Sequence, residues 1–191
     1  GGGYFSNAGV FLIDFIFGLY IFAVILRFLL QLVRADFYNQ LSQAIVTITN
    51  PPLRPMRRFI PPLGSLDTSS IVLAVALQLI SSWLIFQIVG QQPQLVGLIV
   101  VAIAEIISKV FYIFLFGIFI QVIASWIAPG TYNPVLALIE SITSPLMRPA
   151  RRLLPPVGGL DLSPMIAIVV LYLGLMLIVQ PLKDIGRALA L

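Results

Sequence analysis

Residues 49–70 read TNPPLRPMRRFIPPLGSLDTSS, and residues 143–164 read TSPLMRPARRLLPPVGGLDLSP. The two stretches start 94 residues apart, at 49 and 143, and align without a gap. Both carry Arg-Pro, Arg-Arg, Pro-Pro, Gly, Leu-Asp and Ser in the same order and at the same spacing. A match this dense indicates a duplicated unit, and the duplication decides the fold.

The matched loop positions are of four residue types. They are Arg54, Pro55, Arg57, Arg58, Pro61, Pro62, Gly64 and Asp67 in the first copy and Arg148, Pro149, Arg151, Arg152, Pro155, Pro156, Gly158 and Asp161 in the second.

The composition of the chain fits a lipid environment. Of 191 residues, 60% are hydrophobic and 9% are charged, and the mean hydropathy is +1.07. A soluble domain carries roughly 25% charged residues, so charge this scarce does not cover a water-facing surface. The sequence has no cysteine and no histidine, which excludes thiol nucleophiles, disulfides and Cys/His metal sites. We expect neither a metal site nor a cofactor.

Four apolar tracts are candidates for membrane spans, which need about 20 mostly apolar residues. They cover residues 10–33, 69–90, 95–128 and 164–180, and Pro181 is expected to end the last. The third tract is too long for one span, because its length of about 50 Å exceeds a hydrocarbon core of about 30 Å.

The repeat predicts where the third span begins. Shifting 10–33 by the repeat offset gives 104–127, so we expect the span to start near Ala104. Residues 92–103 are then a connector, which either lies at the membrane surface or extends the helix out of the bilayer; a re-entrant segment is less favoured.

The expected fold is an all-α membrane protein with four transmembrane helices. It consists of two parallel two-helix repeats, 10–91 and 104–182, each with a short interfacial amphipathic helix and a Pro/Arg-rich loop. Because each repeat holds an even number of spans, both copies have the same orientation. Most basic residues fall in the two loops, and the positive-inside rule places these loops in the cytoplasm and both termini outside.

A short amphipathic helix is expected after the first span of each copy. Asn39 and Asn133 are N-cap candidates, each followed by apolar residues on one helical face. These helices are too short to span, and we expect them to lie in the interface with the apolar face toward lipid. Packing of that face on protein is the alternative. The apolar positions are Leu41, Ala44, Ile45 and Ile48 in the first copy and Val135, Leu138, Ile139 and Ile142 in the second.

A stiff loop is expected to follow. Since a proline disfavours helical backbone at the residue before it, Arg54 and Arg148 are expected to be extended. The paired prolines predict an extended strut, and the matched glycines predict a turn. Asp67 and Asp161 precede the next helix, where the helix dipole favours a carboxylate and where each is placed to pair with an arginine of its own loop.

The six loop arginines have two interpretations. Near anionic lipid each basic residue gains about 1 kcal/mol, so the loops are candidates for binding headgroups. Alternatively, the arginines only set topology. Topology needs charge alone, whereas the same proline, glycine and aspartate frame occurs twice, which favours a shaped surface.

A few polar residues lie within the predicted spans. Arg27 and Gln121 occupy equivalent positions about two turns from the inner edge. Ionisable residues at such depth are often functional, but a long arginine also snorkels to the interface. Asp14 and Lys109 lie at matched depth near the outer edge, where they are placed to pair; Glu105, four residues before Lys109, is the competing partner.

The chain resembles the YggT family, also called YlmG, over residues 10–182. The motifs that carry the resemblance are Ser125-Trp126-Ile127, Tyr132-Asn133-Pro134 and the loop from Thr143 to Pro164. The first copy departs at Gln31-Leu32 and at Ser65, which stand where the second has Ser125-Trp126 and Gly159. The resemblance implies a bacterial inner-membrane protein with plastid relatives. It implies no single activity, since relatives are linked to division and envelope organisation, to potassium and osmotic tolerance, and to maturation of a plastid b-type cytochrome.

We expect a small membrane scaffold or assembly factor whose loops contact anionic lipid, a membrane-protein partner or a second copy. The rival function is ion conduction, with Gln78, Gln87, Gln121 and Ser125 as polar lining. Catalysis is disfavoured because Asp67 and Asp161 are the only duplicated loop carboxylates, and acids at helix starts are usually structural. No nucleic-acid binding is expected, because the basic residues lack interleaved aromatics.

Overall fold

Four long apolar helices organise the computed structural model, which describes residues 2–191. The first three are α1 (Gly2–Leu32), α3 (Thr68–Ile88) and α4 (Leu95–Ile127). The fourth is continuous through α6 (Ser163–Gly174), the π-helical turn η1 (Leu175–Val179) and α7 (Gln180–Ala190). All four are long and apolar enough to cross a membrane, so the all-α, four-span prediction is confirmed.

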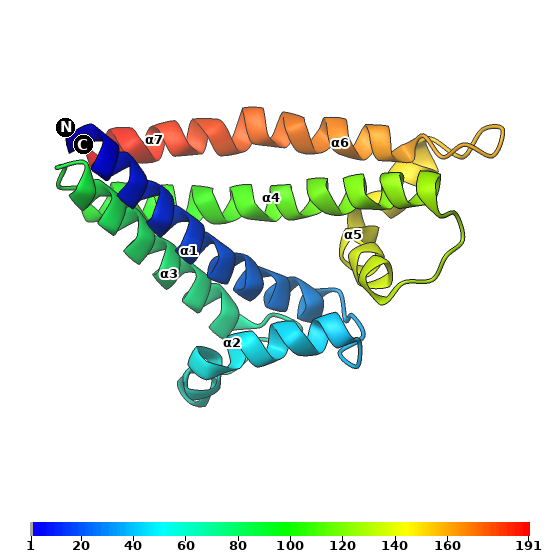
Figure 1. The fold of residues 1–191 in the computed structure, drawn as a ribbon, viewed down its shortest axis with the longest axis horizontal. Helices are drawn as coiled ribbons and strands as arrows, with labels where there is room; N and C mark the ends of the chain where they lie inside the picture. The colour runs from blue at the N-terminus through cyan, green and yellow to red at the C-terminus, as the bar shows by residue number, and fades with distance from the viewer. Residues whose placement is uncertain (1) are drawn as a thin grey trace.

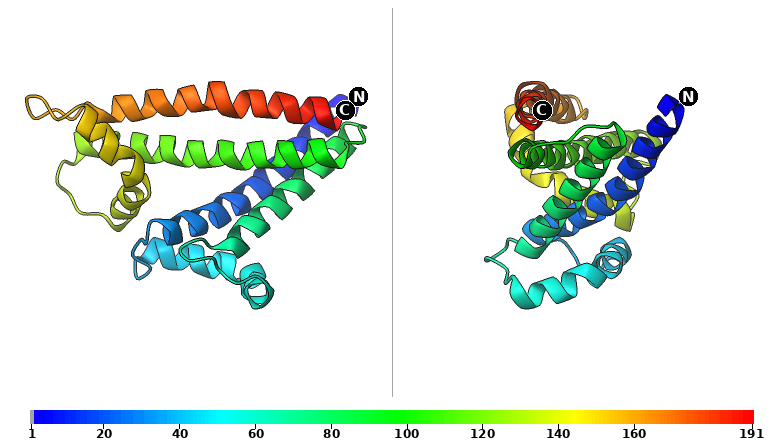
Figure 2. Two further views of the ribbon diagram at one scale, coloured as in Figure 1. Left: turned by 180° about the vertical axis from the view of Figure 1, so that it is seen from behind. Right: turned by 90° about the vertical axis from the view of Figure 1, so that its left-hand side faces the viewer.

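The two copies of the unit run in the same direction. Both chain termini and the α3–α4 connection lie at one end of the molecule, and α2 (Gln40–Phe59) and α5 (Pro134–Leu153) lie toward the other (Figures 1 and 2). The α1–α3 pair is inclined to the α4–α6–α7 pair, and the two pairs meet near the termini (Figure 1). Both basic loops therefore lie at the same end.

The helices α2 and α5 extend beyond the predicted amphipathic segments. The predicted N-caps are confirmed, because Asn39 Oδ1 accepts from Leu41 N at 2.9 Å and Asn133 Oδ1 from Val135 N at 2.8 Å. The prediction that Arg54 and Arg148 are extended is wrong, since both are helical, as are Pro55 and Pro149.

Other groups replace hydrogen bonds that the internal prolines cannot make. Pro52 has no N–H for the carbonyl of Ile48, four residues earlier, and the Tyr20 hydroxyl donates to that carbonyl at 2.9 Å. In α5, Pro145 leaves the carbonyl of Ser141 without its helical donor, and the Ser144 hydroxyl donates to it at 3.2 Å. Both helices change direction along their length (Figure 1), as is usual at proline.

The apolar faces of α2 and α5 pack partly on protein, as the alternative interpretation holds, and are partly exposed. Ile45, Leu138 and Ile142 are buried in one cluster with side chains of α1 and α3. A second cluster joins Met147 of α5 to α4 and α6. Outlying positions of the stripe such as Ile48 remain exposed.

The helix α4 begins at Leu95 rather than near Ala104 and is continuous through the predicted connector. Its first turns pack against the end of α7 at very short distance. A Cβ added to Gly97 would lie 2.1 Å from the backbone nitrogen of Ala190, and Gln94 N donates to Ala190 O at 2.9 Å. The connector is thus a helical extension fixed to α7, not a segment lying apart on the membrane surface.

Pro181 does not end the last helix, contrary to the prediction. The turn before it is π-helical, and Gln180 N–H bonds to the carbonyl of Leu175, five residues back. A proline ring clashes with the carbonyl four residues earlier in a regular α-helix, and a wider turn at this point accommodates it. The helix consequently runs to Ala190 and brings Lys183 against α4.

Candidate functional site

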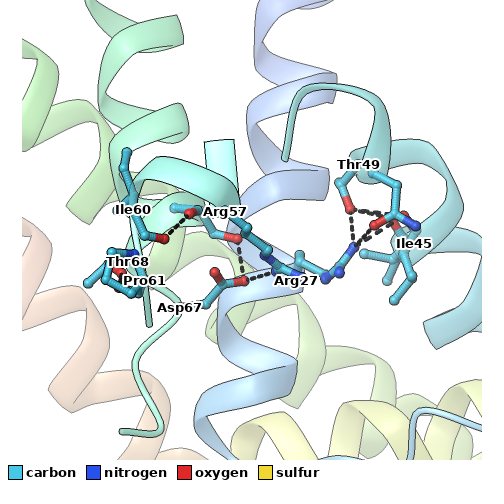
Figure 3. Close-up of polar contacts among 12 residues, drawn as sticks. Arg27, Ile45, Thr49, Arg57, Ile60, Pro61, Asp67 and Thr68 are labelled. Carbon is cyan, nitrogen blue, oxygen red and sulfur yellow. Dashed lines mark hydrogen bonds and ion pairs between the residues drawn. The ribbon is translucent and has the colours of Figure 1, made fainter. Parts of the chain in front are cut away.

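Arg27 joins the first span to α2. Its side chain is 6% exposed, and Nη1 donates to Val46 O at 3.1 Å, Thr49 Oγ1 at 2.9 Å and Asn50 Oδ1 at 3.1 Å. Figure 3 shows the guanidinium pointing from α1 toward the Thr49 turn of α2. The snorkelling interpretation is wrong, because the charge is satisfied by α2 and not by the interface.

In the second copy a neutral side chain makes the equivalent connection between the first span and the amphipathic helix. Gln121, the equivalent of Arg27, donates from Nε2 to Thr143 Oγ1 at 2.7 Å, and Thr143 is the equivalent of Thr49. Each copy therefore ties its first span to its amphipathic helix through one polar side chain and one threonine.

An ion pair closes each basic loop. Arg57 Nη2 lies 2.6 Å from Asp67 Oδ2, and Arg151 Nε lies 3.5 Å from Asp161 Oδ2. The expected pairing of each aspartate with an arginine of its own loop is thus present twice. In the first copy the Ser70 hydroxyl also bonds to Asp67 Oδ2, at 2.6 Å, and the Asp67 side chain is only 3% exposed.

The second ion pair is looser and more open to solvent. The side chains of Arg151 and Asp161 are 42% and 37% exposed. Partial burial by itself raises the pKa of Asp161, but hydrogen bonds from the Ser163 hydroxyl and backbone N–H, together with Arg151, outweigh burial and hold the pKa below its ordinary value. The carboxylate is therefore stabilised in its charged form.

The rest of each loop is a tight turn. Gly64 and Gly158 have left-handed backbone, with φ of 64° and 62°, as the glycines predict. A bridge from Leu63 to Leu66 closes the first turn, and one from Val157 to Leu160 closes the second. Four paired prolines, Pro61, Pro62, Pro155 and Pro156, lie between the preceding helix and the turn and outside any helix. Ion pair and turn together give both loops the same compact shape.

Five of the six loop arginines are exposed, and four of these lie outside the ion pairs. Among residues 2–191, the ion pairs within 4.0 Å include Arg57 and Arg151 but not these four. The four are Arg54 and Arg58 in the first copy and Arg148 and Arg152 in the second. Within each copy the two lie four residues apart, on one face of the last turns of α2 or α5.

Large apolar side chains are exposed beside these arginines. Phe59 and Leu153, at the ends of α2 and α5, are 85% and 75% exposed, and Leu63 and Val157, in the turns, are 65% and 66% exposed. Basic and apolar side chains side by side at one end are typical of a surface that lies in the membrane interface. We name the basic face the arginine face and define it as Arg54, Arg58, Arg148 and Arg152.

A separate polar cluster lies between α3, α4 and α7. Lys109 Nζ lies 3.1 Å from Gln78 Oε1 and 3.9 Å from Glu105 Oε2, and Lys183 Nζ lies 3.4 Å from Glu105 Oε1. Asp14 is exposed and belongs to none of the ion pairs found within residues 2–191. The hypothesis of an Asp14–Lys109 pair is wrong, and the competing Glu105–Lys109 pair is present.

Two contributors to these sites were not predicted. Tyr20 donates a hydrogen bond to the carbonyl freed by Pro52. The only signal in the sequence is a tyrosine in an apolar span about two turns before Arg27. Lys183 follows Pro181, which was expected to end the helix, so it was assigned to the region beyond the span. In the part of the chain that the structure describes, no group of three or more His, Cys, Asp or Glu side chains is placed to hold a metal ion.

Fold and loops together define a multi-pass membrane protein built from a duplicated two-helix unit with both basic loops at one end. A sequence model of the CCB3/YggT family matches residues 6–88 and 100–182, segments whose first residues, 6 and 100, are 94 apart. The chain belongs to this family. The offset between the two matches equals the offset of the loops.

Relatives from several bacteria align along nearly the whole chain. The uncharacterized protein PA0392 of Pseudomonas aeruginosa is 44% identical over 182 residues, which cover 93% of this chain and 91% of that protein. The uncharacterized protein YggT of Escherichia coli is 34% identical over 184 residues, covering 96% and 95%. A protein of Vibrio alginolyticus is 35% identical over 171 residues, covering 88% and 90%. No solved structure matches the chain.

Proposed function

We propose that this protein is a scaffold of the bacterial inner membrane whose two cytoplasmic loops bind anionic lipid headgroups. The observation that supports the proposal most is the arginine face: four exposed arginines, in two matched pairs at one end of the molecule, beside exposed apolar side chains. Anionic phosphates are the natural counterions for such a surface.

The three arginines of each loop differ in their contacts, and this difference supports a binding role. One arginine of each loop, Arg57 or Arg151, pairs with an aspartate and fixes the shape of the loop. The other two remain exposed. If the arginines only set topology, neither the ion pair nor the closed turn would be needed, because topology depends on the number of charges near the span ends.

The energies involved suit a stable but reversible contact. Each basic residue near an anionic leaflet contributes about 1 kcal/mol, so the whole arginine face contributes about 4 kcal/mol. Because two loops act together, the second contact is made at high effective concentration. The protein would thus gather anionic lipid around itself, and other membrane proteins that prefer such lipid would gather with it.

Ion conduction is the alternative function, and a measurement of ion flux into liposomes distinguishes it from the scaffold. The polar side chains expected to line a path have partners inside the protein: Gln78 bonds to Lys109 and Ser82, and Gln121 bonds to Thr143. We therefore retain the scaffold. Selective potassium flux from purified protein in liposomes would reverse this choice.

Lipid retention tests the scaffold proposal. The protein is purified in mild detergent from a defined mixture of phosphatidylglycerol and phosphatidylcholine, and bound lipids are counted by native mass spectrometry. We expect enrichment of phosphatidylglycerol on the native chain and loss of that enrichment when Arg54, Arg58, Arg148 and Arg152 are all changed to Gln. Arg187→Gln, an exposed arginine at the opposite end, is the control and should keep the enrichment. Equal enrichment on the fourfold variant and the native chain would reject the proposal.

A further inference from the structure

A groove opens at the loop end of the second copy, between α4 and α6. Its volume is about 630 Å³, within the range of roughly 300–1,000 Å³ that is common for ligand pockets. The polar lining residues are Gln121, Ser125, Arg151 and Asp161, and the apolar ones include Phe119, Trp126, Met165 and Ile168.

Polarity changes along the groove in the same direction as in a lipid leaflet. On α4, Phe119 lies nearer the middle of the helix, and Ser125 lies nearer its loop end. On α6, Ile168 lies further from the loop than Pro164 does. The charged pair Arg151–Asp161 is at the loop end. The groove therefore presents apolar side chains toward the bilayer centre and charge toward its surface, as a phospholipid does.

The first copy is filled where Phe119 and Asp161 line the groove of the second. Ile25, the equivalent of Phe119, is 3% exposed, whereas Phe119 is 50% exposed. Asp67 is 2% exposed as a residue, whereas the Asp161 side chain is 37% exposed. The first copy does have a pocket of about 450 Å³ at its loop end, but neither Ile25 nor Asp67 lines it, whereas Phe119 and Asp161 both line the groove of the second copy.

A single difference in sequence explains why Asp161 is available. In the first copy Asp67 Oδ2 accepts from both Arg57 and the Ser70 hydroxyl, each at 2.6 Å. The equivalent of Ser70 is Pro164, which has no donor. Both Ser163 bonds go to Oδ1 of Asp161, so Oδ2 has only the Arg151 contact at 3.5 Å. Asp161 thus keeps a carboxylate oxygen with spare capacity, and Asp161 and the exposed Arg151 both line the groove.

We propose that this groove binds one molecule of phosphatidylethanolamine, with the phosphate on Arg151, the ammonium on Asp161 and an acyl chain along Phe119 and Ile168. A neighbouring cation and anion complement a zwitterionic headgroup, whose phosphate and ammonium are joined through only two methylene groups. Phosphatidylglycerol offers no cation for Asp161, and the quaternary ammonium of phosphatidylcholine has no N–H to donate. The proposal is independent of the proposed function, since it uses no residue of the arginine face.

Fluorescence of Trp126 tests the proposal in a bilayer. The chain has two tryptophans, so Trp83→Phe leaves Trp126, which lines the groove, as the only one. This variant is reconstituted in phosphatidylcholine and titrated with phosphatidylethanolamine carrying brominated acyl chains. We expect saturable quenching, half-maximal at a mole fraction about tenfold lower than with brominated phosphatidylcholine, as one charge-assisted hydrogen bond allows.

Asp161→Asn separates the headgroup contact from folding. Asparagine keeps an oxygen that accepts both Ser163 bonds, but it lacks the charge for an ammonium. We expect this variant to lose the tenfold preference, while Asp184→Asn, which removes an exposed carboxylate at the opposite end, keeps it. Met165→Phe, which fills the groove, should also lose it, and Ile71→Phe at the equivalent position of the first copy should not.

The proposal is overturned if quenching rises in proportion to the mole fraction and equally for both lipids. It is also overturned if Asp161→Asn keeps the full preference. Loss of phosphatidylglycerol enrichment in the fourfold arginine variant does not bear on this result, so the two proposals fail separately.

Discussion

Arg27 is a buried cation that acts as a structural connection between two helices. It satisfies a turn of α2 with three hydrogen bonds, at a point where nearby prolines weaken the helix. Gln121 makes the corresponding bond in the second copy with no charge. The position therefore requires a donor of sufficient length, and the charge is secondary.

Replacing Arg27 tests this role. Arg27→Met leaves the α2 acceptors unsatisfied, and each buried unsatisfied group costs about 1–3 kcal/mol. Arg27→Gln reproduces the second copy and should recover most of the loss. Thermal unfolding of the purified protein in detergent measures both variants, and equal stability of the Met and Gln variants would contradict the account.

Asp161 predicts how stability changes in acid. Because the folded state holds its pKa below the ordinary value of 3.8, the carboxylate contributes stability that is complete above pH 3.8. This contribution is lost as pH falls from 3.8 through the lower pKa of the folded state. Asp161→Asn should therefore show a weaker fall in melting temperature over that window. Asp184→Asn, exposed at the opposite end, is the control for net charge, and an acid response of Asp161→Asn as steep as the control's would exclude this contribution.

At the scale of elements, glycine fixes the contact between α4 and α7. Gly97 leaves no room for a Cβ beside the backbone of Ala190, and close backbone approach through small residues is how membrane helices pack tightly. This contact is what makes residues 95–103 part of a helix pair.

Gly97→Ala and Gly18→Ala form a matched pair of substitutions. Gly18 has open space around the added Cβ, so its alanine variant should be neutral or slightly more stable. Gly97→Ala must push two backbones apart and should cost about 1–3 kcal/mol. Melting temperatures of the two variants in detergent give the comparison, and a harmless Gly97→Ala would show that the α4–α7 contact is looser than described here.

Hydrophobicity and the repeat were enough to predict the number, order and direction of the spans. Helix ends at prolines were not predictable in the same way. Proline was expected to exclude helix at Arg54, Arg148 and beyond Pro181, but α2 and α5 continue through Pro55 and Pro149, and a π-helical turn accommodates Pro181. Tyr20 and Ser144 satisfy carbonyls freed by Pro52 and Pro145 in the same helices. A rule about the residue before proline includes none of these compensations.

The candidate site was predictable in part. The six arginines and both aspartates were identified from the repeat, and so was the pairing within each loop. The choice of the arginine that pairs with the aspartate depends on the helical backbone at Arg54 and Arg148. The effect of a proline on the residue before it predicts extended backbone there. The predicted Asp14–Lys109 pair rested on matched depth in the bilayer, which does not determine which side chains meet. Lys183 joins the Glu105–Lys109 cluster only because the last helix continues past Pro181.

For the whole molecule, the two copies of the unit have the same orientation. Both basic loops, and with them most of the positive charge, therefore lie at one end. The two copies differ in detail. The first has a buried aspartate in its ion pair and a charged residue, Arg27, between its first span and α2. The second has an exposed ion pair and the neutral Gln121 at that position.

The central claim is that both basic loops face the same, cytoplasmic side of the membrane. The chain has no cysteine, so single cysteines at Ser65 and Gly159, at the tips of the two turns, and at Gln91, between α3 and α4, report sidedness without further changes. Each variant is expressed in bacterial cells and exposed to a membrane-impermeant maleimide before and after lysis. We predict that Ser65→Cys and Gly159→Cys are labelled only after lysis and Gln91→Cys before it. Labelling of the two loop tips from opposite sides would contradict the account.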